Sequence, residues 1–259
     1  DDETVEILKK YDPWIDYWVS EPDEGQSDAI NKGLECCTGD VFNWLNSDDF
    51  LVPSSLSKIG RAIGNHDAVV AEGWRMYSEK SQYGQTTHLS CNALIVGHAD
   101  PSVRGGMFTQ QAVWLRTDQV KECGGVDPDI EYAMDRDLYI RYTRHFDDIC
   151  FIASPVAVFR LHEESKTGQA TGHFRESQCR ILKKLLQDPD FESKKDLIRW
   201  ALSRLRWKEY VIQVLQSEES DWVRARKLLT GLIKAPIRRF DRPTLGAIKR
   251  VVLGQSEEA

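Results

Sequence analysis

An apolar pentapeptide followed directly by two adjacent carboxylates restricts the fold of this chain more than any other feature. Residues 41–45 (VFNWL) predict a strand that is apolar enough to lie inside a covered sheet. Residues 46–49 (NSDD) follow this strand at once, and Pro53 and Ser54 indicate the start of a helix a few residues later. Because ligands of open α/β sheets bind outside the carboxyl ends of the strands, we expect a ligand site at residues 46–49.

The two carboxylates at positions 48 and 49 indicate what such a ligand contains. Neighbouring negative charges repel each other, and a shared cation relieves the repulsion. Carboxylate oxygens are hard ligands that suit Mg²⁺ or Mn²⁺ carrying a phosphate. An Asx-rich turn in which Ser54 caps the next helix accounts for the same residues without a ligand. Residues 46–49 taken alone favour that turn. The choice between a turn and a ligand site therefore depends on the rest of the chain.

Charge is unevenly distributed along the 259 residues, which allow one large domain or one domain with an appendage. The formal net charge is −7, but residues 194–259 hold 15 Lys and Arg against 8 Asp and Glu. The remainder is therefore acidic, which argues against general nucleic-acid binding, because phosphate contacts need a basic face. The basic C-terminal part is compatible with peripheral contact to an anionic membrane, with a solvated face or with an oligomer contact.

The cysteines predict free thiols rather than disulfides or a metal site. The chain contains six of them: Cys36, Cys37, Cys91, Cys123, Cys150 and Cys179. They form no CxxC pair and no metal-ligand spacing, so we expect buried, reduced thiols in the cytosol. The sequence has no run of 18 or more apolar residues, so no membrane-spanning segment is expected.

Five motifs follow one another along the first 170 residues. They are DETVEIL, EPDEGQSDAINKG, WLNSDD with LVP after it, GGVDPDIEYAMDRDLYIRY and FRLHEESKT. Together and in this order they resemble the inverting family 2 glycosyltransferases of the GT-A fold. The first two resemble the family's donor-binding half, the third its DXD region, the fourth its acceptor and catalytic-base segment, and the fifth its closing histidine segment.

The resemblance implies an α/β fold with a GT-A type nucleotide-sugar-binding sheet flanked by helices. Residues 1–171 are expected to form this domain, and residues 172–259 a helical C-terminal extension in which we identify no chemistry. In the family a strand–helix–strand unit comes before the segment with which this chain begins. We therefore expect the first strands to be missing and the chain to be truncated at its N-terminus.

The resemblance also implies a metal site and a catalytic base. Asp48, Asp49 and His162 are expected to hold Mn²⁺ or Mg²⁺ against the donor diphosphate. Asp135 matches the Asp of the family's Glu-Asp pair and is the expected base, although Met134 replaces the Glu. On spacing alone an Asp at position 135 is more often a carboxylate at a helix N-terminus that serves the helix dipole.

Asp137 follows two residues after the expected base and cannot share its face of a helix. We predict that Asp137 is structural and pairs with Arg141, four residues on.

The remaining site residues are assigned by their position in these motifs. The donor is expected to contact Gln26, Asp28, Lys32, Asn46, Ser47, Asp48, Asp49 and Lys166, and the acceptor to contact Arg104, Gln110 and Gln111. Amide side chains offer donors and acceptors that suit sugar hydroxyls, and Lys offers a point charge to a phosphate. Each residue taken singly is about as well explained by a solvated helix or an ordinary glycine loop.

Periodicity and turn residues predict the elements. Helices are expected at 4–10, 28–37, 54–63, 118–123, 135–146, 174–186, 194–215, 222–233 and 244–253. Strands are expected at 15–19, 41–45, 67–73, 74–78, 87–95, 112–116, 149–152 and 156–161, the first two parallel through a right-handed crossover.

These inferences predict an enzyme that moves a sugar from a nucleoside-diphosphate donor to a sugar or lipid-linked glycan acceptor with inversion. A role in cell-surface or extracellular polysaccharide synthesis follows from the resemblance. The cysteines indicate a cytoplasmic location, and the basic C-terminal part indicates peripheral contact to the inner face of a membrane. Two alternatives remain open: a nucleotidyltransferase-like enzyme, and a non-catalytic protein that binds nucleotide sugars.

Overall fold

The computed structural model describes residues 3–77, 80–84, 89–97, 108–162 and 171–234, together with Gly246. Its strands are β1 (Val41–Phe42), β2 (Phe50–Leu51), β3 (Ala68–Tyr77), β4 (Lys80–Gly84), β5 (Val113–Arg116) and β6 (Ile149–Leu161). Its helices are α1 (Thr4–Tyr11), α2 (Gln26–Cys36), α3 (Ser55–Ile63), α4 (Cys91–Gly97), α5 (Thr117–Glu122), α6 (Met134–His145), α8 (Thr171–Leu185), α9 (Lys195–Gln216) and α10 (Asp221–Lys234). Short 3₁₀ helices cover Asp12–Trp14, Gln110–Ala112 and Pro189–Lys194.

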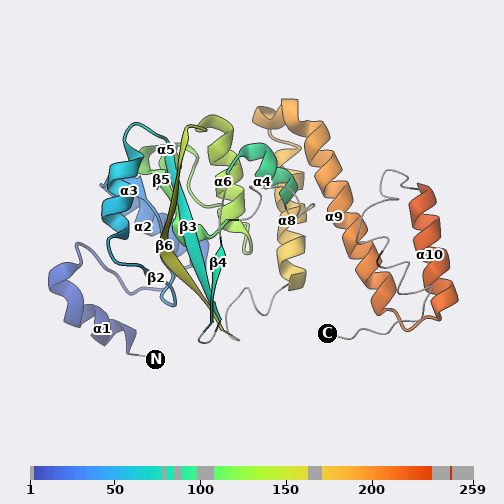
Figure 1. The fold of residues 1–259 in the computed structure, drawn as a ribbon, viewed down its shortest axis with the longest axis horizontal. Helices are drawn as coiled ribbons and strands as arrows, with labels where there is room; N and C mark the ends of the chain where they lie inside the picture. Colours follow the sequence, from blue (N-terminus) through green and yellow to red (C-terminus); the bar gives the residue numbers. More distant parts are fainter. Residues whose placement is uncertain are drawn as a thin grey trace.

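Two long parallel strands, β3 and β6, form the centre of the sheet (Figure 1). The strand order is β1-β5-β3-β6-β2, and β4 pairs with β3. Residues 68–71 of β3 (AVVA) are at most 1% exposed, which explains why this run is uniformly apolar. The register of β3 against β6 shifts on both sides of Glu72, as in a β-bulge, and β3 continues beyond it into a hairpin with β4.

Helices cover both faces of this sheet, and each face has its own core. On one face, α3 packs Ile59 and Ile63 against Val69 and Val156. The other face packs against a larger cluster that includes Leu94 of α4, Leu138 of α6 and residues of α8 and α9. Figure 1 shows α3 on one side of the β3–β6 pair and α4 and α6 on the other.

The C-terminal helices are joined to the sheet through α8 and α9. Ile181 and Ile198 are 1% and 0% exposed and belong to the same core as the sheet. The far half of α9 instead packs with α10, through a separate cluster that includes Trp207 and Leu228. The division into domains at residues 171 and 172 stays a prediction.

Most expected elements are confirmed with small shifts of their ends. The helices expected from residue 4 to residue 233 and the strand at 112–116 all form, while the expected strands at 149–152 and 156–161 join into one strand, β6. The helix expected at 244–253 lies outside the described residues, apart from Gly246.

Two predicted strands are wrong. Residues 15–19 pair with no strand in the described part of the chain, so β1 has no parallel neighbour and pairs antiparallel with β5. Tyr17 and Val19 stay largely exposed, so this segment has no packed layer to lie against. The strand predicted at 87–95 is replaced by the helix α4. Its β-branched residues favoured a strand, but the helix is buried against α6 and α9, and such packing overrides propensity.

All six cysteines lie in the described residues and carry free thiols, as predicted. Their predicted burial is wrong, because only Cys91 is buried and Cys36 is exposed. Within the described ranges we find no helix that is both long enough and apolar enough to cross a membrane.

Candidate active site

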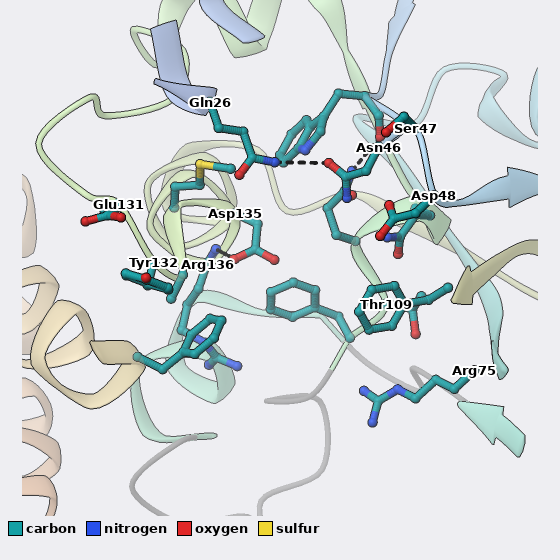
Figure 2. Close-up of a pocket in the computed structure, with 18 of the residues that line it drawn as sticks. Gln26, Asn46, Ser47, Asp48, Arg75, Thr109, Glu131, Tyr132, Asp135 and Arg136 are labelled. Carbon is teal, nitrogen blue, oxygen red and sulfur yellow. Dashed lines mark hydrogen bonds between the residues drawn. The ribbon is translucent and has the colours of Figure 1, made fainter. Parts of the chain in front are cut away.

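A cavity of about 630 Å³ borders the C-terminal halves of the parallel strands β3 and β6. Its lining comes from the start of α2, the segment between β1 and β2, residues 108–111, and the first residues of α6 and α8 (Figure 2). This is the end of a parallel sheet at which α/β folds bind ligands.

Asp48 and His162 meet at one side of this cavity. His162 Nε2 lies 3.0 Å from Asp48 Oδ2. The antiparallel pairing of β2 with β6 causes this contact, because it brings residues that precede Phe50 close to residues that follow Leu161. Both side chains are partly exposed, at 31% for Asp48 and 42% for His162, so a ligand in the cavity can reach them.

Asp49 is held by protein groups instead. Its Oδ2 accepts hydrogen bonds from Gln111 Nε2 at 2.5 Å and from Asn46 Nδ2 at 3.1 Å. Its Oδ1 accepts a hydrogen bond from the backbone N–H of Arg160, with an N–O distance of 3.0 Å. Burial raises the pKa of Asp49, and these hydrogen bonds lower it again in part. The described residues contain no group of three His, Cys, Asp or Glu side chains that could hold a metal ion, so the predicted trio of Asp48, Asp49 and His162 is not assembled.

A chain of amides connects α2 to this acidic segment. Gln26 Nε2 donates to Asn46 Oδ1 at 3.0 Å (Figure 2). Asn46 in turn donates to Asp49. Gln26, Asn46 and Ser47 all line the cavity, and their contact with a donor stays a prediction.

Asp135 lies across the cavity from Asp48 (Figure 2). It occupies the first turn of α6, is half-buried, and accepts the backbone N–H of Arg136 at 2.7 Å. Burial raises the pKa of Asp135, while this hydrogen bond and the positive charge of Arg136 act in the opposite direction. A half-buried carboxylate with a raised pKa that faces a cavity has the properties of a general base.

Asp137 pairs with Arg141, as predicted. It is 2% exposed, and Arg141 donates to its Oδ2 from Nε at 2.9 Å and from Nη2 at 2.8 Å. Arg141 Nη2 also donates to the carbonyl of Gly125, so the pair ties α6 to the preceding glycine turn.

Comparisons with known proteins show which proteins this chain is similar to. The family model for "Glycosyl transferase family 2" matches residues 1–118. Residues 1–118 are therefore similar to glycosyl transferase family 2. A glycosyltransferase of Rickettsia felis is 25% identical over 191 residues, and one of Mycobacterium tuberculosis is 26% identical over 145 residues. The matches cover 70% and 54% of this chain but only 30% and 52% of those relatives, so the chain spans about a third to half of their length.

Solved structures confirm the α/β fold of the GT-A type. The structure of S. aureus TarS 1–349 in complex with UDP-GlcNAc matches 99% of this chain and 81% of that one, with a TM-score of 0.63 and 16% identity. The mannosyltransferase PcManGT of Pyrobaculum calidifontis, in complex with GDP-Man and Mn²⁺, matches 99% of this chain and 76% of that one. Its TM-score is 0.50 and its identity is 14%.

The side chains of Gln110 and Gln111 line the cavity and donate hydrogen bonds to other protein groups. Gln110 Nε2 donates to the carbonyl of Trp44 at 2.8 Å, and Gln111 donates to Asp49. Both are buried and line the cavity. They therefore hold the acidic segment in place, and their acceptor role stays a prediction.

Two of the predicted donor residues lie away from the cavity. Asp28 and Lys32 pair with each other at 3.1 Å, and Lys32 also reaches Glu21 at 3.3 Å. Neither belongs to the cavity lining. Arg104 and Lys166 lie outside the described residues.

Sequence reasoning missed a buried cation in the cavity wall. Arg136 is 4% exposed, its Nη1 donates to the carbonyl of Leu94 at 2.7 Å, and its guanidinium lies 5.3 Å from the centre of the Phe108 ring. Burial lowers the pKa of Arg136 to about 10. Its place next to the predicted base was the available signal.

Proposed function

We propose that this chain transfers a sugar from a nucleoside-diphosphate sugar to an acceptor hydroxyl with inversion, in the synthesis of a cell-surface or extracellular glycan. One observation carries the proposal: a single cavity has the Asp48–His162 pair on one side and Asp135 on the other (Figure 2). The first side suits a diphosphate with its cation, and the second suits a hydroxyl that must lose a proton. UDP-GlcNAc bound to TarS and GDP-Man bound to PcManGT support the donor class.

We propose that Asp48 and His162 are the protein ligands of Mn²⁺ or Mg²⁺. Adjacent ligands of an octahedral ion at about 2.0–2.1 Å are about 3 Å apart, and the two atoms here are 3.0 Å apart. Mg²⁺ commonly binds proteins through one or two side chains, with water and substrate phosphates completing the shell, so two ligands suffice. The Mn²⁺ in the PcManGT complex supports this assignment. When bound, the ion neutralises charge on the diphosphate leaving group.

Asp49 has a positioning role in this proposal. Both of its carboxylate oxygens accept hydrogen bonds from the protein, from Gln111, Asn46 and the backbone of Arg160. The bond from Arg160 ties the segment that carries Asp48 to β6, which leads to His162, and the bond from Gln111 ties it to residues 110–112.

Asp135 acts as the base. The acceptor hydroxyl gives its proton to the Asp135 carboxylate while its oxygen forms a bond to the anomeric carbon. The bond between that carbon and the diphosphate oxygen breaks, and the nucleoside diphosphate leaves with the electron pair. The partial burial of Asp135 raises its pKa and makes it a stronger base, and the neighbouring Arg136 favours its ionised form.

The test is transfer itself. UDP-GlcNAc and GDP-mannose are incubated with the protein, Mn²⁺ and candidate acceptors, and nucleotide release and product configuration are followed by NMR. We expect a product whose anomeric configuration is opposite to that of the donor. Retention of configuration would contradict the mechanism, and donor binding without any transfer would favour the non-catalytic alternative.

We also propose peripheral contact with an anionic membrane at its cytoplasmic face, where a lipid-linked acceptor would be found. The C-terminal 66 residues carry the excess of Lys and Arg. On α10, Trp222 and Ile233 are 70% and 73% exposed and lie three turns apart on one side, while Leu228 is buried against α9. Flotation with anionic vesicles tests this: we expect salt-sensitive binding that Trp222→Ala weakens, and absence of binding contradicts it.

A further inference from the structure

Two aromatic rings stand beside the proposed base. Tyr132 comes three residues before Asp135, and Phe174 comes from the first turn of α8, far along the chain. Their ring centres are 5.2 Å apart with the planes at 68°, an edge-to-face pair. Both residues line the cavity. An aromatic wall, Tyr132 with Phe174, therefore lies on the side of the cavity that the base occupies.

His173 fixes the orientation of this wall. Its ring stacks on Tyr132 with centres 5.4 Å apart and planes at 15°. Phe174 is half-buried and packs against the main core, so the wall has little freedom to reorient. With one face of Tyr132 covered by His173, the ring surface that borders the cavity is preorganised for a ligand.

Glu131 directly precedes Tyr132 of this wall. It is exposed and lines the same cavity next to Tyr132 (Figure 2). An ionised carboxylate accepts hydrogen bonds from hydroxyl groups but offers no charge complement to a phosphate. The combination of aromatic surface, hydroxyl acceptor and base suits a ligand with an apolar face and several hydroxyl groups.

We infer that Tyr132, Phe174 and Glu131 form an acceptor subsite for a sugar ring, so that the acceptor is a carbohydrate. One face of a pyranose carries C–H groups, which pack on the electron-rich face of an aromatic ring. Its hydroxyl groups are then directed to Glu131 and Asp135. This inference rests on the proposed function, and it makes α8, which lies beyond the family match at residues 1–118, a part of the active site.

Binding of small glycosides tests the subsite without requiring transfer. The probes are the methyl glycosides of glucose, galactose, mannose and N-acetylglucosamine, with glycerol as a hydroxyl-bearing control that has no ring. Saturation-transfer NMR is recorded with the full chain in the presence of UDP, GDP and Mn²⁺. We expect saturation of the ring C–H protons of at least one glycoside and none for glycerol.

Four variants separate the ring surface from the fold. Tyr132→Ala and Phe174→Ala should weaken glycoside binding by about tenfold or more, whereas Tyr132→Phe, which keeps the ring, should bind like the parent. Tyr11→Ala is the matched control, because Tyr11 is an exposed ring on α1 outside the cavity lining. Nucleotide affinity, measured by calorimetry, should be unchanged in all four.

The outcomes distinguish this inference from the proposed function. A parent protein that binds nucleotide but no glycoside overturns the subsite, as does a Tyr132→Ala, Phe174→Ala double variant with parental glycoside affinity. A parent protein that binds neither UDP nor GDP overturns the proposed function and the subsite with it. If loss of glycoside binding in Tyr132→Ala is accompanied by equal loss of nucleotide binding, the wall is structural and the inference is wrong.

Discussion

His162 and Asp48 are 114 residues apart in the sequence, yet His162 Nε2 lies 3.0 Å from Asp48 Oδ2. The last residues of β6 and the short strand β2 are antiparallel, and this pairing makes the contact. The neighbouring carboxylate, Asp49, is turned into the protein by three hydrogen bonds. Two adjacent acids thus have different environments, and the first prediction follows from that difference.

Asp48→Ala should reduce Mn²⁺-dependent affinity for UDP-GlcNAc or GDP-mannose by at least about tenfold, or about 1.4 kcal/mol, because an anionic ligand is lost beside a diphosphate. His162→Ala should reduce it less, because a neutral ligand contributes less charge. Titration calorimetry with and without Mn²⁺ measures both, with the exposed Asp221→Ala on α10 as control. Parental donor and metal affinity in Asp48→Ala would show that the metal site lies elsewhere.

Asp135→Asn should lower turnover by about 10²–10⁴-fold, the usual contribution of general-base catalysis. The amide keeps the shape of the side chain but cannot take the proton. Donor affinity should hardly change, because Asp135 lies across the cavity from Asp48. Steady-state kinetics together with donor calorimetry make this comparison, and near-parental turnover would remove Asp135 as the base.

The acid limb of kcat/KM should report Asp135. Burial raises the pKa of this carboxyl above the ordinary Asp value of about 3.9, and only the ionised form accepts a proton. Activity should therefore fall as pH decreases through that raised pKa.

The effect of Asp135 on stability has the opposite sign. A carboxyl whose pKa is raised in the folded state stabilises that state at pH values below its unfolded-state pKa, and this contribution is lost as pH rises through its folded-state pKa. Asp135→Asn should therefore gain stability relative to the parent as pH increases, which denaturation at several pH values measures.

Asp137→Asn should mainly affect stability. Removing one partner of a buried ion pair leaves Arg141 without its counter-charge, which typically destabilises a protein by about 3–5 kcal/mol. Arg141 is partly exposed and also donates to the carbonyls of Cys123 and Gly125, so the lower end of this range is expected. Urea unfolding measures the change. A variant that is stable but inactive would show that Asp137, and not Asp135, is the base.

Gly73→Ala should displace Thr109, a residue that lines the cavity. A Cβ added at Gly73 would lie 2.5 Å from Thr109 Cγ2 and 2.6 Å from its Cβ, so Thr109 would have to move. Thr109 precedes Gln110 and Gln111, which brace the acidic segment. Overpacking of this kind costs about 1–3 kcal/mol. Thermal unfolding and donor affinity should both decline, whereas Gly39→Ala, with no atom within 4 Å of the added Cβ, should be close to neutral.

The sequence by itself determined the local features. Apolar runs and turn residues predicted most helices, the central strand that begins β3, and the pairing of Asp137 with Arg141, because periodicity and i, i+4 spacing are local properties. The order of its motifs was enough to indicate the family and the fold. It also indicated residues that line the cavity, such as Gln26 and Asn46.

Only the tertiary structure decided how these pieces are used, because contacts between distant segments depend on packing and register. It gave Asp48 and Asp49 different environments, because Gln111 and the backbone of Arg160 donate hydrogen bonds to Asp49. It converted residues 91–97 into a helix, through burial against α6 and α9. It also brought Phe174 to the edge of Tyr132, which no local pattern records, because the two residues meet only when α8 packs against the core of the sheet.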